Sequence, residues 1–291
     1  MATVGSYSLT QGQSTGDIVI SSPIAALQVI GTGTAATGFG NDLLVTIAIN
    51  SRLGGRYNLA VDMDLYTLYR LRQKFAGYAI FNTAAAAANY SFGIDLGLDG
   101  RSIYLDDDLQ LIVNFRNAAA AATTHAFTLT SVEGAEVEPI YSEYQRLSFP
   151  ASAGSTEQPQ DLSQALMLYL PITATPWTQA RLVAKSQRGR QQSLVYPSSA
   201  SLEAAGIEVK PIIAVDRAGT AVLYAHNLPV TFNGQTLNVS KFDTLFLTYT
   251  SVQSPTVMRP RFGVGSMAGL TVPPQAPRIS ERLARALGLA S

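Results

Sequence analysis

The chain has 291 residues and a formal net charge of zero, with 20 basic and 20 acidic residues. It contains no cysteine, which excludes disulfides and thiolate metal sites. It also has no basic arm that would bind nucleic-acid phosphates, so neither direct genome packaging nor sequence-specific nucleic-acid binding is expected.

The chain also has an unusually low share of charged residues. Charged residues make up 14% of the chain, against about 25% in an average soluble protein. A weakly charged surface is typical of a protein whose sides are covered by copies of itself. The first ten residues lack the charged and apolar regions of a signal peptide, and no window holds about 20 consecutive apolar residues. We therefore expect a soluble protein that is made in the cytoplasm.

Short runs of apolar and β-branched residues, most of them bounded by turn-forming residues, fill the first half of the chain. The clearest is Asp108–Phe115, in which Leu109, Leu111, Val113 and Phe115 alternate with other side chains, as in a half-buried strand. About ten such runs at this spacing predict a β-sandwich or barrel. They are 17–21, 26–31, 42–50, 56–61, 77–82, 90–96, 102–105, 108–115, 125–130 and 136–147.

One segment departs from the strand pattern. Asp64–Phe75 carries Leu65, Leu68 and Tyr69 at helical spacing after an aspartate that can cap a helix, which predicts one short helix. The alternative is a long strand over 66–75. Two Ala-rich tracts, 84–88 and 118–122, stand between strands, and we interpret them as loops or short turns.

The segment Ser148–Asp161 is poor in large apolar residues and predicts a linker. Strand-like runs resume after it at 164–173, 181–184, 192–196, 207–215, 220–224, 229–232, 236–239, 244–252 and 256–264. Short helices are expected within 176–185 and 201–205. We therefore predict an all-β fold of two consecutive jelly-roll β-barrels with one or two short helices each, the first over residues 1–149 and the second over 150–272.

The end of the chain, residues 273–291, changes character. A Pro-rich spacer at 273–277 precedes a basic amphipathic segment. Its apolar stripe and its neighbouring basic stripe predict contact with a membrane or with another subunit. The residues concerned are Arg278, Ile279, Arg282, Leu283, Arg285 and Leu287.

Motifs for catalysis or nucleotide binding are weak. The glycine-rich segment 31–38 has the wrong spacing for a dinucleotide-binding loop, and no amphipathic helix follows it. His125 and His226 are the only two histidines, and neither lies in a hydrolase or zinc-binding motif. The sequence therefore predicts neither an enzyme nor a bound cofactor.

An acidic segment partly matches a calcium-binding loop. Asp95, Asp99, Gly100 and Asp106 match the first, fifth, sixth and twelfth EF-hand positions, but Gly97 removes the third ligand and strands flank the segment. An EF-hand is therefore excluded. Two alternatives stay open here: a structural Ca²⁺ held by Asp106, Asp107 and Asp108, or a solvated acidic turn.

The plan of two strand-rich halves, each with an early helix, resembles the double jelly-roll major capsid proteins of tailless icosahedral phages with an internal membrane, in particular the corticovirus type. The most specific local similarity is the strand, Ala-rich turn and strand of Asp107–Ser131. The resemblance implies a homotrimer with pseudo-hexagonal outline, barrels perpendicular to the capsid surface, lateral capsomer contacts, minor capsid or vertex proteins as partners and a place in the virion.

Two other classes of protein stay open at this point. One is a single-jelly-roll viral shell protein with a projecting domain after residue 150. The other is a non-viral two-domain β-protein, such as a lectin or fibre module, although the aromatic residues do not gather into a sugar-binding platform.

Overall fold

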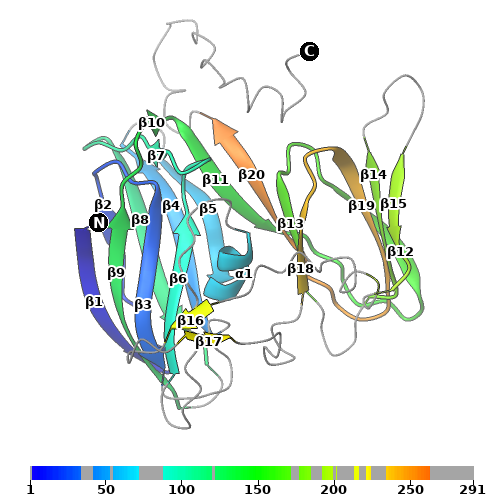
Figure 1. The fold of residues 1–291 in the computed structure, drawn as a ribbon, viewed down its shortest axis with the longest axis horizontal. Helices are drawn as coiled ribbons and strands as arrows, with labels where there is room; N and C mark the ends of the chain where they lie inside the picture. Colours follow the sequence, from blue (N-terminus) through cyan, green and yellow to red (C-terminus); the bar gives the residue numbers. More distant parts are fainter. Residues whose placement is uncertain are drawn as a thin grey trace, which may run out of the picture.

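The structure is a computed structural model of the chain. It describes residues 2–33, 42–52, 55–71, 88–119, 122–171, 177–184, 192–198, 201, 213–215, 221–223 and 234–262. These residues form two barrels that lie side by side, with the strands of both running in the same general direction (Figure 1).

The first barrel is built from eight strands in two four-stranded antiparallel sheets. They are β1 (Ala2–Thr10), β2 (Ile18–Ile20), β3 (Ala26–Gly33), β4 (Leu43–Ser51), β5 (Gly55–Asp64), β6 (Ala88–Asp95), β8 (Leu109–Asn117) and β9 (Thr124–Val132). One sheet has the order β1-β9-β3-β6 and the other the order β2-β8-β4-β5. Counted along the chain, the two sheets hold strands one, eight, three and six and strands two, seven, four and five, which is the order of a jelly roll.

The second barrel repeats this order with eight further strands. They are β11 (Ile140–Arg146), β12 (Thr156–Asp161), β13 (Met167–Pro171), β14 (Gln179–Ala184), β15 (Ser193–Tyr196), β18 (Gly234–Asn238), β19 (Phe242–Tyr249) and β20 (Thr256–Phe262). Its sheets have the orders β11-β20-β13-β18 and β12-β19-β14-β15. Each position in the first barrel therefore has a counterpart in the second. The prediction of two consecutive jelly rolls is confirmed.

Two short pairs of strands complete the described β-structure. β7 (Ser102–Ile103) and β10 (Val137–Glu138) are parallel, whereas β16 (Ile213–Val215) and β17 (Ala221–Leu223) are antiparallel. β7 and β10 lie at one end of the first barrel (Figure 1).

Strand β8 shows how alternation builds the core. Leu111, Val113 and Phe115 have no exposed surface, whereas Gln110 and Asn114 on the opposite face are partly exposed. Burying one such apolar side chain contributes about 1.5–3 kcal/mol. The predicted half-buried strand at 108–115 is therefore confirmed.

Helix α1 (Leu65–Arg70) follows β5. The Asp64 carboxylate caps it, accepting hydrogen bonds from the Thr67 backbone N–H at 2.7 Å and from the Thr67 hydroxyl at 2.8 Å. Leu65 and Leu68 are fully buried, so the predicted apolar stripe faces the core. This confirms the start of the predicted helix; its last residues, 72–75, lie outside the described part of the chain.

The second half of the predicted linker is a strand. Thr156–Asp161 is β12, which pairs with β19, and Ile140–Arg146 before it already pairs with β20. β12 is an edge strand of polar residues containing Pro159, and such a strand resembles a linker in the sequence because its partner strand supplies the apolar side chains. We propose that the barrels divide at residues 133–139 in place of 148–161.

The helix expected within 176–185 was wrong. Gln179–Ala184 is strand β14, in which Ala180 and Leu182 point into the core. Tertiary pairing with β19 and β15 outweighs the local helix preference of these residues. Of the helix expected at 201–205, only Ser201 is described.

Several predicted features lie outside the described residues: most of the Ala-rich tract 84–88, His226 and the whole of the tail 273–291. Within the described residues, no helix has the length and apolar composition needed to cross a membrane.

Candidate functional site: the inter-barrel interface

The second barrel packs on the first through the outer face of its β11-β20-β13-β18 sheet. Tyr144, Tyr169 and Met258 on this face belong to the buried cluster of the first barrel. Their neighbours Leu168 and Val257 belong to the core of the second barrel. Because side chains alternate between the faces of a strand, one sheet contributes to two cores and joins the barrels into one unit.

Strand β11 adds hydrogen bonds to the apolar contact. The Ser142 N–H donates to the Leu96 carbonyl at 2.6 Å, and the Tyr144 hydroxyl donates to the Asp95 carbonyl at 2.5 Å. Complete burial raises the pKa of Tyr144 well above 10, with the nearby charge of Asp95 adding to the effect. The phenol therefore stays protonated and remains a donor at any physiological pH.

Strand β5 of the first barrel lies alongside β11. Between them, Tyr57 lies beside an ion pair of Arg261 with Glu143. Burial, and then the charge of Glu143, raise the pKa of Tyr57, and the hydrogen bond to Glu143 raises the pKa of Arg261. A tyrosine from one barrel thus meets a charge pair from the other.

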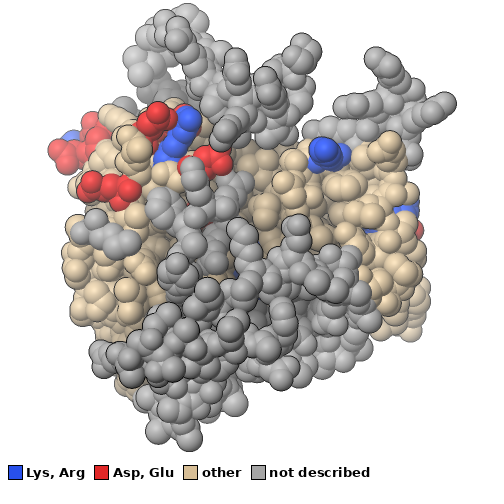
Figure 2. All heavy atoms as spheres, viewed as in Figure 1, with Lys and Arg blue, Asp and Glu red and all other residues tan. Residues whose placement is uncertain are grey.

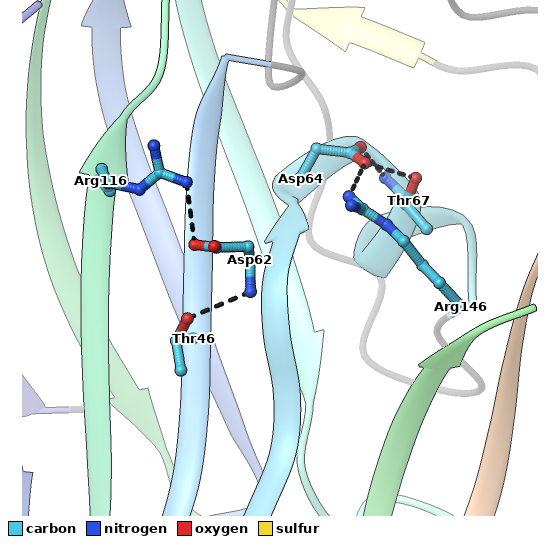
Figure 3. A network of polar contacts seen from close by, with 6 residues as sticks. All are labelled: Thr46, Asp62, Asp64, Thr67, Arg116 and Arg146. Carbon is cyan, nitrogen blue, oxygen red and sulfur yellow. Dashed lines mark hydrogen bonds and ion pairs between the residues drawn. The ribbon is translucent and has the colours of Figure 1, made fainter. Parts of the chain in front are cut away.

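Asp64, the cap of α1, also reaches the second barrel (Figure 3). Its Oδ2 lies 3.6 Å from an Nη2 of Arg146, the last residue of β11. Burial is the largest influence on this carboxyl and raises its pKa from the ordinary value of 3.8, although the bonds from Thr67 and the charge of Arg146 act in the opposite direction. The carboxylate is therefore held at the interface at a desolvation cost.

A β-bulge precedes Asp64 in the chain. Opposite β4, the step from Ala60 to Met63 on β5 spans one residue more than the facing step, and Asp62 has a φ of 46° in the left-handed region. Its N–H donates to Thr46 Oγ1 at 3.1 Å, and its carboxylate pairs with Arg116 at 3.1 Å (Figure 3). Bulges bend a strand and redirect the side chains that follow, here at the point where Asp64 turns to the second barrel.

The last turn of α1 makes the remaining contact. The Arg70 carbonyl accepts a hydrogen bond from the Thr236 hydroxyl of β18 at 2.9 Å. The Arg70 guanidinium lies 5.9 Å from the centre of the Tyr169 ring on β13, within cation–π range. One sheet of the second barrel thus packs against β5, α1 and the end of β6.

A polar cavity of about 390 Å³ lies in the second barrel, at the turn between β12 and β13 and beside β11 and β20. The buried guanidinium of Arg259 lines it and donates to the carbonyls of Asp161 (2.7 Å) and Ser163 (3.3 Å) and to the side-chain oxygen of Gln145. Burial lowers the pKa of Arg259. Arg259 thereby ties the turn before β13 to strands β11 and β20.

The three aspartates predicted as a cation site do not form a ligand cluster. Among the described residues, no group of three His, Asp or Glu side chains is arranged to hold a metal ion. One Asp106 oxygen accepts the N–H groups of Asp108 (2.9 Å) and Leu109 (2.7 Å), and the other accepts the Tyr104 hydroxyl at 2.8 Å. The Tyr104 bond lowers the pKa of Asp106. The structure thus has an acidic turn closed by its own hydrogen bonds.

His125 lies inside the first barrel. Its Nε2 is 3.1 Å from Asp42 Oδ1, and both side chains are largely buried. This pair joins β9 to the residue before β4. The second histidine and the six tail residues predicted to contact a membrane or a subunit lie outside the described residues.

Sequence reasoning missed the inter-barrel interface. A signal was present in β20, where consecutive apolar residues lie on opposite faces: Val257 packs in the second barrel and Met258 packs against the first. Apolar residues on both faces of a strand indicate a sheet that packs on both sides.

Two complete jelly rolls in one chain, joined through the outer face of a sheet, define a double jelly-roll fold. No family model matches the sequence, and no curated protein matches it.

Three solved structures are similar in arrangement. The major capsid protein P2 of bacteriophage PM2 is 12% identical, with a TM-score of 0.42, covering 91% of this chain and 100% of that chain. A chain of the Sputnik virophage is 9% identical, with a TM-score of 0.36 and coverages of 98% and 94%. The mavirus major capsid protein is 7% identical, with a TM-score of 0.25 and coverages of 89% and 84%. All three TM-scores are below 0.5, and the double jelly-roll fold follows from the strand order of this chain.

Proposed function

We propose that this chain is a viral structural protein, a major capsid protein that assembles as pseudo-hexagonal trimers into an icosahedral shell. The observation that supports the proposal is the pair of jelly rolls with identical strand order, packed side by side with their strands aligned. Three such chains supply six similar barrels, and a closed ring of six has the outline that tiles a near-hexagonal lattice.

The surface charge supports large contacts between copies. On the face drawn in Figure 2, charged side chains gather mainly at one end of the first barrel, and most of the remaining described surface carries none. Uncharged surfaces lose little hydration when they are buried. The sides of the barrels therefore suit lateral capsomer contacts, and the protein belongs in the virion.

Light scattering on the purified chain, followed by electron microscopy at rising protein concentration, tests the proposal. We expect trimers and then shells or sheets of trimers. A persistent monomer at high concentration contradicts the capsid function. A monomer that binds glycans on an array supports the lectin or fibre module instead. The single-jelly-roll alternative does not agree with the second jelly roll in the described fold.

For the tail, we propose contact with an internal lipid membrane. The alternatives are a neighbouring subunit and a minor capsid or vertex protein. Arg278, Arg282 and Arg285 lie beside an apolar stripe at helical spacing, and each basic residue contributes about 1 kcal/mol at an anionic surface. One segment of this length binds weakly, so many copies act together.

Deletion of residues 278–291 tests this proposal. Flotation of assembled particles with anionic liposomes should fall sharply in the deletion variant, while trimers persist. Unchanged flotation contradicts the membrane contact. Loss of trimers with unchanged flotation points to contact between subunits.

A further inference from the structure

The outer face of the β1-β9-β3-β6 sheet has one charged residue, Asp95, which is buried at the β6 edge. Core side chains such as Val29 and Leu129 point inward, so the residues between them point outward. On β1, β9 and β3 the outward side chains include Ser6, Ser8, Gln28, Ile30, Ala126, Thr128 and Thr130, none of which carries a charge. On the edge strand β6, the outward Ser91 and Asp95 are buried within the chain. Ile30 is 47% exposed at the centre of this face.

The polar groups on this face bond to one another. The Ser6 and Thr128 hydroxyls are 3.1 Å apart, and the Gln28 side-chain amide donates to the Ser91 hydroxyl at 3.2 Å. A face whose polar groups already have partners can be buried at low cost. It needs no charged partner, and a charged partner would lose hydration against it.

The corresponding sheet of the second barrel shows what such a face does. In the jelly-roll order, β11-β20-β13-β18 is the counterpart of β1-β9-β3-β6. Its outer face is buried within the chain against the first barrel, alongside β5 and α1. β5 is the fifth strand of its barrel and the edge of its sheet. One of the two equivalent faces is therefore buried in the same chain, whereas the other keeps exposed surface along β1 and at Ile30.

The counterpart of β5 in the second barrel is β15, the edge of the β12-β19-β14-β15 sheet. Among the described strands it pairs only with β14. Leu194 is 42% exposed and Val195 is 40% exposed, and no residue of β15 is charged. An exposed apolar edge strand is a ready contact surface. In Figure 1, β1 and β3 lie on the side of the molecule opposite β15.

We propose that the β1-β9-β3-β6 face of one copy packs on β15 of a second copy, repeating between chains the contact that joins the two barrels within a chain. The interface is heterologous, because the two surfaces differ. It closes into a ring of six barrels from three chains. The proposal rests on the proposed capsid function for the trimer, and it names the surfaces that form it.

The absence of cysteine in the chain allows a direct test. We expect the full-length double variant Ile30→Cys/Val195→Cys, treated with a short bismaleimide, to give covalent dimers and covalent trimers. Each single variant should give neither, because a heterologous contact never brings two copies of one position together.

Two outcomes contradict these surfaces. One is a trimer by light scattering that the double variant does not cross-link. The other is cross-linking of a single variant, which indicates a two-fold contact. Light scattering distinguishes failure of these surfaces from failure of the capsid function. A monomer in solution contradicts both, whereas a trimer without cross-links contradicts only the surfaces.

A substitution that places a charge on the β1-β9-β3-β6 face tests the proposal in a second way. Ile30→Lys should lower the trimer fraction at least tenfold, because it buries an unpaired charge. Val19→Lys is the matched control: Val19 is 53% exposed on the other sheet of the same barrel, and its variant should form trimers like the wild type. Equal trimer fractions for both variants contradict the proposal.

Discussion

Asp64 has two roles that single substitutions separate, because it caps α1 and also lies at the barrel interface. Asp64→Ala removes the acceptor of both Thr67 hydrogen bonds. Loss of an N-cap costs about 0.5–2 kcal/mol. In a chain of this size, each kcal/mol of lost stability lowers the thermal unfolding midpoint by about 2–4 °C. The thermal midpoint of Asp64→Ala should therefore fall by about 1–8 °C.

Asp64→Asn should behave differently at neutral pH. Asparagine caps helices about as well as aspartate, and it carries no charge to desolvate. The pair with Arg146 contributes little, since the arginine side chain is 43% exposed and the separation is 3.6 Å. We therefore expect Asp64→Asn to be within about 0.5 kcal/mol of wild type, or more stable.

The pH dependence gives the sign of the effect. Burial raises the pKa of Asp64 in the folded state above 3.8, so the unfolded chain releases this proton first as the pH rises. The carboxyl therefore lowers folding stability progressively as the pH rises from about 3.8 through its folded-state pKa, and Asp64→Asn lacks this loss.

Denaturant unfolding of wild type, Asp64→Asn and Asp64→Ala between pH 3.5 and 7 measures these differences. The stability of Asp64→Asn relative to wild type should increase with pH. A relative stability of Asp64→Asn that falls as the pH rises would refute the assignment of burial as the dominant influence, and would show that the charge of Arg146 dominates.

Two further predictions concern close packing and the interface. Gly97→Ala should destabilise the protein by about 1–3 kcal/mol, because an added Cβ overlaps the Arg101 carbonyl, whereas the control Gly154→Ala, with no atom within 4 Å, should match wild type in thermal unfolding. Tyr144→Phe removes the buried donor to the Asp95 carbonyl and should lower the free energy of unfolding by about 1–3 kcal/mol. An unchanged midpoint of denaturant unfolding would show that this hydroxyl does not stabilise the contact between the barrels.

Much of the strand content could be predicted because strand alternation is local. Leu111, Val113 and Phe115 define a buried face without knowledge of the neighbouring strands, and the same holds for Leu245 and Leu247 of β19. The start of α1 was also local, because a capping carboxyl and the backbone N–H that it accepts are three residues apart.

The errors occurred where long-range pairing outweighs local preference. The polar strand β12 and the Ala-containing strand β14 exist because β19 lies between them and supplies apolar partners. The acidic turn at Asp106 is a different case, because its donors are local: the Asp108 and Leu109 N–H groups and the Tyr104 hydroxyl are two or three residues away. These contacts agree with the alternative of an acidic turn, which the sequence left open.

An all-β protein with two strand-rich halves was predictable, because apolar alternation and turn residues are properties of short segments. Which strands are neighbours and which sheet face is shared depend on pairing between distant segments, which the local pattern does not contain. Contacts such as Asp64 with Arg146 and Tyr144 with Asp95 join residues about 50 to 80 positions apart, so no short segment of the sequence contains both partners.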